Sequence, residues 1–181
     1  MEKKKSAGIL LYRLKNKALE VLLVHHGGPF WAKKDLASWS IPKGEFTEEE
    51  NPLEAAKREF QEETGLDLTG DFIELTPIKQ KSGKLVYGWA VAGDIDPAQI
   101  KSNTFEMEWP PKSGKRQSFP EIDKGEWFSV PESKLKILEP QTALIDELIS
   151  ILKLTPEQTI SLNSNVKPKD DSAKPTQIDL F

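Results

Sequence analysis

The 181-residue chain contains no cysteine and only two histidines, His25 and His26. Without cysteine it forms no disulfide, which fits the reducing environment of the cytoplasm. Two adjacent histidines and no thiol make a zinc site a poor interpretation. No apolar run approaches the length of a membrane span, and the first eight residues, MEKKKSAG, lack the apolar stretch of a signal peptide. We therefore expect a cytoplasmic protein with no membrane association.

The charge balance and length also restrict the function. The formal net charge is −4, which argues against broad affinity for nucleic acid. The chain is long enough to bury a full core. After Leu154 the composition becomes polar, with proline and without apolar periodicity. We expect one domain over residues 1–154 and a flexible tail over 155–181 that ends in QIDLF.

A short acidic segment carries clear signals for a helix. Asn51 is a good N-cap, Pro52 suits the first helical position, and Glu54 lies where a capping box requires it. Gly65 suits the left-handed residue that ends a helix. These signals predict a helix over residues 52–64.

At 100° per residue this helix presents two neighbouring faces. One is apolar and can pack on a core: Leu53, Ala56 and Phe60. The other carries three carboxylates: Glu59, Glu62 and Glu63. Ala55 lies among the acids and would leave room for a hydrated ion. Clustered carboxylates favour Mg²⁺ or Mn²⁺, although an acidic helix face that is simply solvated is the alternative.

The full pattern extends beyond the helix. From Gly44 to Leu66 the sequence reads GEFTEEENPLEAAKREFQEETGL. Gly44, then Glu50 after five residues, then REFQEETGL after seven more, resembles the Nudix box at every fixed position. The chain thus resembles a Nudix hydrolase over roughly residues 6–154.

The resemblance implies an α/β (α+β) fold, a Nudix-type α/β/α sandwich with a mixed β-sheet. It also implies a magnesium-dependent pyrophosphohydrolase that breaks a phosphoanhydride in a nucleoside diphosphate-linked substrate, such as a nucleoside triphosphate or a dinucleoside polyphosphate. Water attacks phosphorus in such enzymes, and positioning and charge neutralisation dominate the catalysis. The alternative is a Nudix-fold binding or sensor module without turnover. The intact cluster of repelling acids favours the enzyme.

The resemblance also assigns roles by position. The metal would be held by the box acids and a backbone carbonyl: Glu59, Glu62, Glu63 and Gly44. Arg58 would orient a box carboxylate, and Glu50 would brace the loop. The general base is a box glutamate or an acid of the later segment FPEIDKGEW, either Glu121 or Asp123. For those two, a surface loop position without a catalytic role is the alternative.

Substrate contacts must come from outside the box. Lys43 directly precedes it and is placed to meet a phosphate. Phe30 and Trp39 could stack on a base, with core packing as the alternative for each. The segment 102–123 has few strand signals and reads as a long loop, of a kind that is often functional. Its basic residues 112, 115 and 116 would supply positive charge to bind phosphates if the segment folds over the site.

The remaining pattern predicts regular elements around the box. Strands are expected at 7–14 and 19–25, at 72–79 and 84–92, and at 126–130. A last helix is expected over 140–153, where an apolar stripe should face the core.

The end of the chain carries a second motif. Gln177, Leu180 and Phe181 lie in QIDLF, which resembles the peptide Gln-x-Asp/Ser-Leu-Phe by which bacterial proteins dock on the DNA sliding clamp. A tethered Leu-Phe pair is suited to an apolar pocket. The alternative is that this apolar end packs on its own domain.

Overall fold

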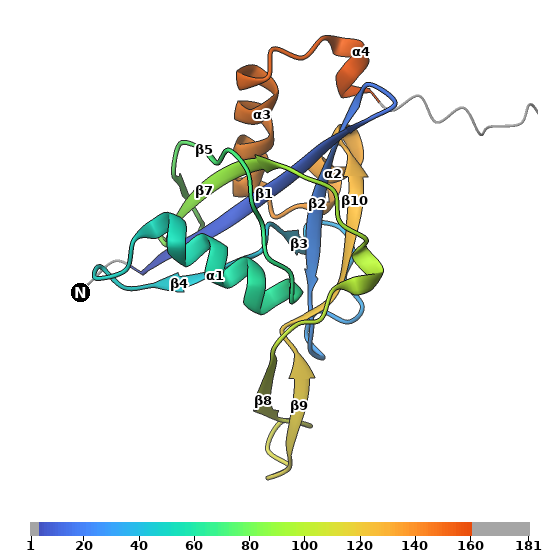
Figure 1. Ribbon diagram of the computed structural model, residues 1–181. Coiled ribbons are helices and arrows are strands. Elements are labelled where there is room, and N and C mark those ends of the chain that lie inside the picture. The colour runs from blue at the N-terminus through green and yellow to red at the C-terminus, as the bar shows by residue number, and fades with distance from the viewer. Residues whose placement is uncertain (1–3, 161–181) are drawn as a thin grey trace, which may run out of the picture.

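The computed structural model describes residues 4–160 as a mixed sheet with helices on both faces (Figure 1). The main path of the sheet runs in the order β10-β2-β1-β7-β5, and β3, β4 and β6 pair beside it on β2, β1 and β7. Its strands are β1 (Lys5–Lys15), β2 (Ala18–His26), β3 (Trp39–Ser40), β4 (Lys43–Phe46), β5 (Ile73–Glu74), β6 (Ile78–Lys79), β7 (Leu85–Ala92) and β10 (Ile122–Ser129).

The helices and a separate two-stranded ribbon complete the described part. The α-helices are α1 (Pro52–Thr64), α2 (Val130–Lys136), α3 (Thr142–Ile151) and α4 (Pro156–Thr159), with short 3₁₀ turns η1 (Pro97–Gln99) and η2 (Glu139–Gln141). The ribbon consists of β8 (Thr104–Glu108) and β9 (Arg116–Pro120).

Strand β1 lies in the middle because both of its faces are apolar. It pairs antiparallel with β2 and parallel with β7. Ile9 and Leu11 pack in the cluster beneath α1, whereas Leu10 and Tyr12 pack in the cluster beneath α3. A strand buried on both faces reads as a continuous apolar run rather than an alternation.

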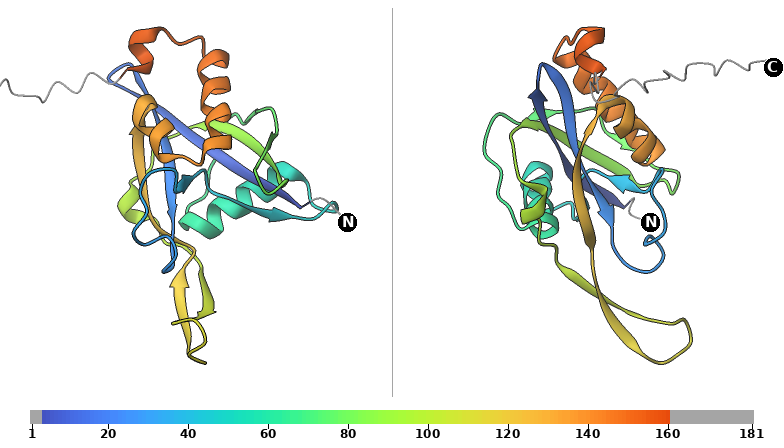
Figure 2. Two further views of the ribbon diagram at one scale, coloured as in Figure 1. Left: turned by 180° about the vertical axis from the view of Figure 1, so that it is seen from behind. Right: turned by 90° about the vertical axis from the view of Figure 1, so that its right-hand side faces the viewer.

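The two helical layers confirm the predicted α/β/α sandwich. On one face of the sheet, Ala56 and Phe60 of α1 are fully buried, and on the other Leu144 and Leu148 of α3 are fully buried. Figures 1 and 2 show α1 and α3 on opposite sides of the sheet.

The helix of the acidic segment has the predicted bounds, Pro52–Thr64. The Asn51 side chain accepts hydrogen bonds from the N–H groups of Leu53 and Glu54, at 3.0 and 3.2 Å. Gly65 ends the helix at φ +75°, in the left-handed region. The expectation for Ala55 is wrong. It is fully buried in the core cluster and does not lie in an open space among the acids.

Two predicted elements differ in extent. The strand expected over 72–79 is divided into β5 and β6, and Pro77, which has no N–H to donate, lies between them. The last helix starts at Thr142 rather than 140, because the 3₁₀ turn η2 precedes it. Helix α2 was not expected. It begins at Val130, the last residue of the predicted strand 126–130.

The segment 102–123 is not a loop. It forms the hairpin β8–β9, with Phe105 opposite Phe119, and this hairpin projects from the body (Figures 1 and 2). Its turn carries Lys112 and Lys115 at the far end. Lys112, Lys115 and Arg116 were expected to serve phosphates if the segment folds over the box; antiparallel pairing extends it outward instead, so that condition is not met.

The described structure continues past the boundary predicted at residue 154. Helix α4 follows that position and contacts β2. The clamp-like peptide with Gln177, Leu180 and Phe181 lies outside the described residues, so it stays a prediction. Within residues 4–160, no helix is long and apolar enough to cross a membrane.

The cap of α1 gives a first test. We expect Asn51→Ala to lower the free energy of unfolding by about 1 kcal/mol, because two N–H groups lose their acceptor. For a chain of this length the melting temperature would fall by about 2–4 °C. Thermal or urea unfolding measures the effect. Asn51→Asp keeps an acceptor oxygen and should behave like the unchanged protein, and an equal loss in both variants would contradict this account.

Candidate functional site

The site begins where α1 crosses β4. A Cβ atom built on Gly44 would lie 1.9 Å from a carboxylate oxygen of Glu59, far inside contact distance. Only glycine at this position lets the Glu59 carboxylate reach the backbone of β4. The Gly44 of the box thus brings one acid and one strand together.

Arg58 is bound by three carboxylates. Its Nε and Nη2 donate to Glu50 at 2.8 and 3.1 Å, and its Nη1 donates to Glu59 at 2.7 Å and to Glu62 at 3.2 Å. These bonds raise the pKa of Arg58, although burial acts against them. The guanidinium therefore holds the box acids in position and neutralises part of their charge.

The remaining acids are crowded and poorly hydrated. Glu63 is only 7% exposed and accepts a hydrogen bond from the backbone N–H of Lys43 at 3.0 Å. Burial raises the pKa of Glu63 to about 8, against the attraction of Lys43, and the charges of Glu59 and Glu121 raise it further. Burial likewise raises the pKa of Glu59, while Arg58 opposes the shift. A divalent cation would relieve this unfavourable concentration of negative charge.

The donor set fits such a cation, although the cation is not part of the structure. Within residues 4–160, no three Asp, Glu or His side chains stand in a geometry that could hold a metal ion. Arg58 donates hydrogen bonds to carboxylate oxygens of Glu59 and Glu62, which are two of the expected metal ligands. The box nevertheless combines carboxylate oxygens with the close approach at Gly44, which is chemistry suited to Mg²⁺ or Mn²⁺.

A cavity of about 470 Å³ opens beside these acids. Its wall combines the end of β2, the loop after it and strand β8, and its acidic members are Glu63 and Glu121. The other lining residues are His26, Gly27, Gly28, Pro29, Phe30, Trp31, Phe105 and Met107. One cavity thus joins an acid of the box to an aromatic wall.

The aromatic residues of this wall are preorganised by ring contacts. The ring of His26 lies 5.1 Å from that of Trp31, and Phe30 meets Trp109 edge-on at 5.5 Å. Phe30 is 60% exposed, so its ring is accessible from the solvent. Burial first, and then the charges of Lys43 and His25, lower the pKa of His26 to about 4. At pH 7 His26 is therefore a neutral part of the wall.

Hydrogen bonds at the root of the hairpin place Glu121. Its N–H donates to the carbonyl of Asn103 and its carbonyl accepts from the N–H of Gly27, both at 2.8 Å. Asn103 in turn donates to the carbonyl of Glu62 at 3.0 Å. The hairpin root is thus attached both to α1 and to the loop after β2. Burial and the charge of Glu62 raise the pKa of Glu121.

Asp123, the other acid considered as a base, lies elsewhere. Its carboxylate is 2.8 Å from Nδ1 of His25, and Nε2 of His25 is 2.7 Å from the carbonyl oxygen of Lys34. Since a carbonyl only accepts, Nε2 carries a proton there. This pair fixes the loop after β2. Of the two later acids, Glu121 is the one that lines the cavity.

Trp39 does not face the cavity, contrary to its assignment as a base-stacking residue. It is 1% exposed and packs against His25 and Phe128 at ring distances of 5.2 and 4.8 Å. Its ring offers no face to a ligand, because strand β3 places it in the core. Lys43 does not line the cavity. Its charge nevertheless acts on two residues that do line it, Glu63 and His26.

Sequence reasoning missed Phe105 and Met107, which line the cavity from β8. A signal was present in TFEME, where apolar and acidic residues alternate as in a half-buried strand. A matching short stretch, RQSFP, follows after a turn that contains proline and glycine.

The comparison with protein families then decides the assignment. The model of the NUDIX domain matches residues 2–148. The chain belongs to the Nudix family. Its enzymes hydrolyse phosphoanhydride bonds and generally use divalent cations, so this Nudix protein is a hydrolase that acts on phosphorus-containing anhydrides.

Solved structures agree with the Nudix fold. An Ap4A hydrolase from C. elegans, in a binary complex, has a TM-score of 0.58 at 18% identity, over 82% of this chain and 98% of that one. The NUDIX domain of Shewanella oneidensis NrtR, complexed with ADP ribose, has a TM-score of 0.59 at 15% identity, over 84% and 90%. A NUDIX hydrolase from Nitrosomonas europaea has a TM-score of 0.54 at 20% identity, over 88% and 97%. No curated protein matches the Nudix chain significantly.

The raised pKa of Glu63 predicts how stability depends on pH without divalent cations. The folded protein holds this proton more tightly than the unfolded chain, whose pKa is near 4.5. The resulting stabilisation is complete below pH 4.5 and is lost as the pH rises through about 8. We expect the free energy of unfolding in EDTA to fall by at least about 1 kcal/mol between pH 5 and 8.5.

Urea unfolding at a series of pH values measures this fall. Glu63→Gln should flatten the profile because the amide does not ionise, whereas Glu49→Gln, at an exposed position, should leave it unchanged. Adding Mg²⁺ at pH 8.5 should restore stability. A profile with the same slope in Glu63→Gln would contradict the assignment.

Proposed function

We propose that this Nudix protein is a magnesium- or manganese-dependent pyrophosphohydrolase of a nucleoside diphosphate-linked substrate, such as a nucleoside triphosphate or a dinucleoside polyphosphate. The observation that carries the proposal is the cavity of about 470 Å³, which joins Glu63 and Glu121 to the open ring of Phe30. Its volume lies within the range of small-molecule sites. A ligand with phosphates at one end and an aromatic base at the other matches this arrangement.

The phosphate end would lie against the box. Glu59, Glu62, Glu63 and the carbonyl of Gly44 would hold the cation. When bound, that cation neutralises phosphate charge and favours ionisation of a bound water. Lys43, whose charge acts on Glu59 and Glu63, adds a cation of the protein itself for a phosphate oxygen.

The base end would lie against the aromatic wall. Phe30 offers an open ring, and Trp31 and Phe105 line the same cavity from the loop and from β8. Stacking on such rings depends little on the identity of the base. The structural neighbours named as an Ap4A hydrolase and as a complex with ADP ribose support a substrate of this class.

Glu121 would act as the general base. A water oxygen attacks phosphorus and gives its proton to the Glu121 carboxylate, while the phosphoanhydride P–O bond breaks and its electron pair leaves with the departing phosphate. Burial and Glu62 raise the pKa of Glu121 towards neutrality, which strengthens it as a base. Arg58 would act as a positioning residue, since it holds Glu59 and Glu62.

A hydrolysis screen with Mg²⁺ tests the proposal. Nucleoside triphosphates, dinucleoside polyphosphates, nucleotide sugars and inositol pyrophosphates are offered, and product release is measured by chromatography. For the substrate that is cleaved, Glu62→Gln and Glu63→Gln should each remove most of the activity, and Glu121→Gln should lower kcat by about 10²–10⁴-fold.

The matched control is Glu54→Gln, on the exposed side of the same helix, which should keep its activity. Activity that survives both Glu62→Gln and Glu63→Gln would remove the metal assignment. An intact chain that binds these compounds but cleaves none would favour the binding or sensor module.

A second test separates the aromatic wall from the core. We expect Phe30→Ala to raise KM about 5- to 150-fold with little change in stability, because it removes one stacking surface of about 1–3 kcal/mol. Trp39→Phe should show the opposite pattern, a loss of stability with an unchanged KM, since Trp39 packs in the core. Steady-state kinetics and thermal unfolding of both variants check this. A KM that rises only in Trp39→Phe would contradict the placement.

A further inference from the structure

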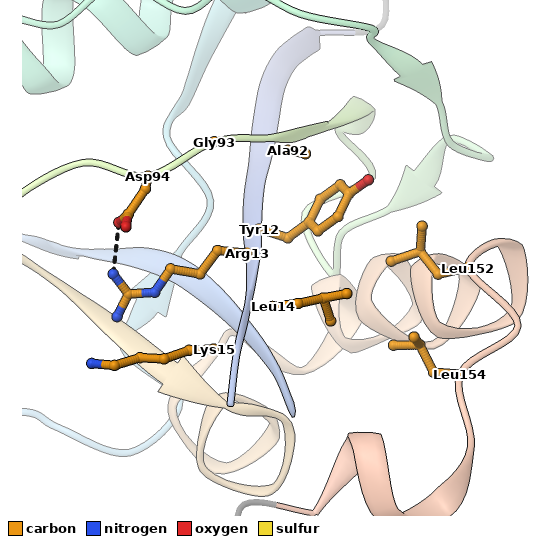
Figure 3. Close-up of a pocket in the computed structure, with 9 residues that line it drawn as sticks. All are labelled: Tyr12, Arg13, Leu14, Lys15, Ala92, Gly93, Asp94, Leu152 and Leu154. Carbon is orange, nitrogen blue, oxygen red and sulfur yellow. Dashed lines mark hydrogen bonds and ion pairs between the residues drawn. The ribbon is translucent and has the colours of Figure 1, made fainter. Parts of the chain in front are cut away.

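A second and larger cavity, of about 790 Å³, lies at the other end of the central strands (Figure 3). It is formed by the end of β1, the chain just after β7 and the chain just after α3. The lining residues are Tyr12, Arg13, Leu14, Lys15, Ala92, Gly93, Asp94, Leu152 and Leu154. None of them lines the cavity beside the box.

The backbone of β1 is open along this cavity. The parallel pairing of β1 with β7 ends at Tyr12 opposite Ala92, and the N–H of Gly93 then donates to the carbonyl of Tyr12 at 3.0 Å. From Arg13 to Lys15, β1 pairs with β2 alone among the described strands. Because peptide groups point alternately to the two sides of a strand, those of Leu14 face the open side, as those of Tyr12 do. Such an edge can accept an added strand.

The two sides of this edge differ in character. Figure 3 shows Tyr12, Leu14, Leu152 and Leu154 around one apolar space. Leu14 is 53% exposed there, which is unusual for a leucine beside a core. Arg13 and Lys15 project to the other side of the strand in the same figure.

The two cations on that side are not equivalent. Arg13 is committed to Glu20 at 2.6 Å and Asp94 at 2.7 Å, and its guanidinium lies 4.2 Å from the ring of Trp127. Lys15 is exposed and has no ion pair within residues 4–160. The open edge therefore offers leucines on one side and an available positive charge on the other.

We propose that residues 177–181 of this same chain dock along this edge as an added strand. In the sequence QIDLF, Ile178 and Leu180 are two positions apart and would share one side, and Asp179 would point to the other. Ile178 and Leu180 thus match the apolar side at Leu14, and Asp179 matches Lys15. By the same alternation Gln177 and Phe181 would lie on the side of Asp179, where Arg13 and Lys15 project.

The described part of the chain ends near this edge. The last described residue, Ile160, follows α4, which contacts β2 at the end of the sheet where β1 turns into β2 (Figures 1 and 2). Sixteen residues, 161–176, link Ile160 to Gln177. The average end-to-end distance of a sixteen-residue random coil is about 20–24 Å. A linker of this length supplies an effective concentration in the millimolar range, so a weakly binding peptide still docks.

The docking edge is separate from catalysis. Strand β2 begins at Ala18 beside this edge and ends at His26 in the catalytic cavity. At about 3.3 Å per residue the two ends are about 26 Å apart. Docking would bury the side chain of Leu180. It would therefore compete with any other protein that binds this leucine.

Hydrogen exchange of the Leu14 amide, followed by NMR on the full chain, tests the proposal. With an effective concentration of about 1 mM and a peptide Kd of about 0.1 mM, the Leu14 N–H should exchange about tenfold more slowly than in the double variant Ile178→Ser, Leu180→Ser. The matched control is Leu162→Ser with Val166→Ser, which replaces two aliphatic residues by serine between Ile160 and Gln177 and should leave the exchange rate unchanged.

The charge pair gives an independent test. Lys15→Glu and Asp179→Lys should each speed exchange at Leu14, and the two together should restore protection because the attraction is reversed. Equal exchange rates in all these proteins would overturn the proposal and leave the peptide free for a partner such as the sliding clamp. Protection that grows with protein concentration would also overturn it, since the segment would then bind a second copy. Hydrolysis should be unchanged in Ile178→Ser, Leu180→Ser, so these outcomes do not depend on the proposed reaction.

Discussion

Carboxylates that repel one another are held together where α1 crosses β4, and much of the molecule serves to keep them there. Glu59 and Glu63 are nearly buried, so their charges are poorly hydrated. Arg58 binds three acids, and Gly44 leaves room for Glu59 beside the strand. The buried face of α1, with Phe60 on the sheet, fixes the helix against this repulsion. A divalent cation would complete the charge balance that Arg58 only partly provides.

The two cavities lie at opposite ends of the central strands of the sheet. At one end of β2, the cavity beside the box lies between Glu63 and the hairpin β8–β9. At the other end, the shorter reach of β7 leaves part of β1 without a neighbour. Strand β2 extends between them and pairs with β1 near its start and with β10 over the rest of its length. We infer that chemistry and docking can therefore vary independently.

Local sequence signals are sufficient to predict the box helix but not the cavity beside the box. The caps at Asn51 and Gly65 depend on residues next to them, so they were readable along the chain. Which of the two later acids lines the cavity depends on His25, almost a hundred positions away in the chain. His25 binds Asp123, and Glu121 is the acid that lines the cavity. Trp39 is buried against Phe128, which lies far from it in the sequence. Phe30 contacts Trp109, which lies in the hairpin that the sequence analysis expects to be a loop.

The sequence by itself determined the family, the helix that carries the box and the acids suited to a divalent cation, because these rest on spacing within 23 consecutive residues, Gly44 to Leu66. Tertiary structure decided which of those acids are buried, which later acid reaches them and which aromatic rings remain open. Burial and raised pKa values arise from neighbours brought in by strand pairing and helix packing. Distances along the chain do not specify those neighbours, and only the folded sheet does.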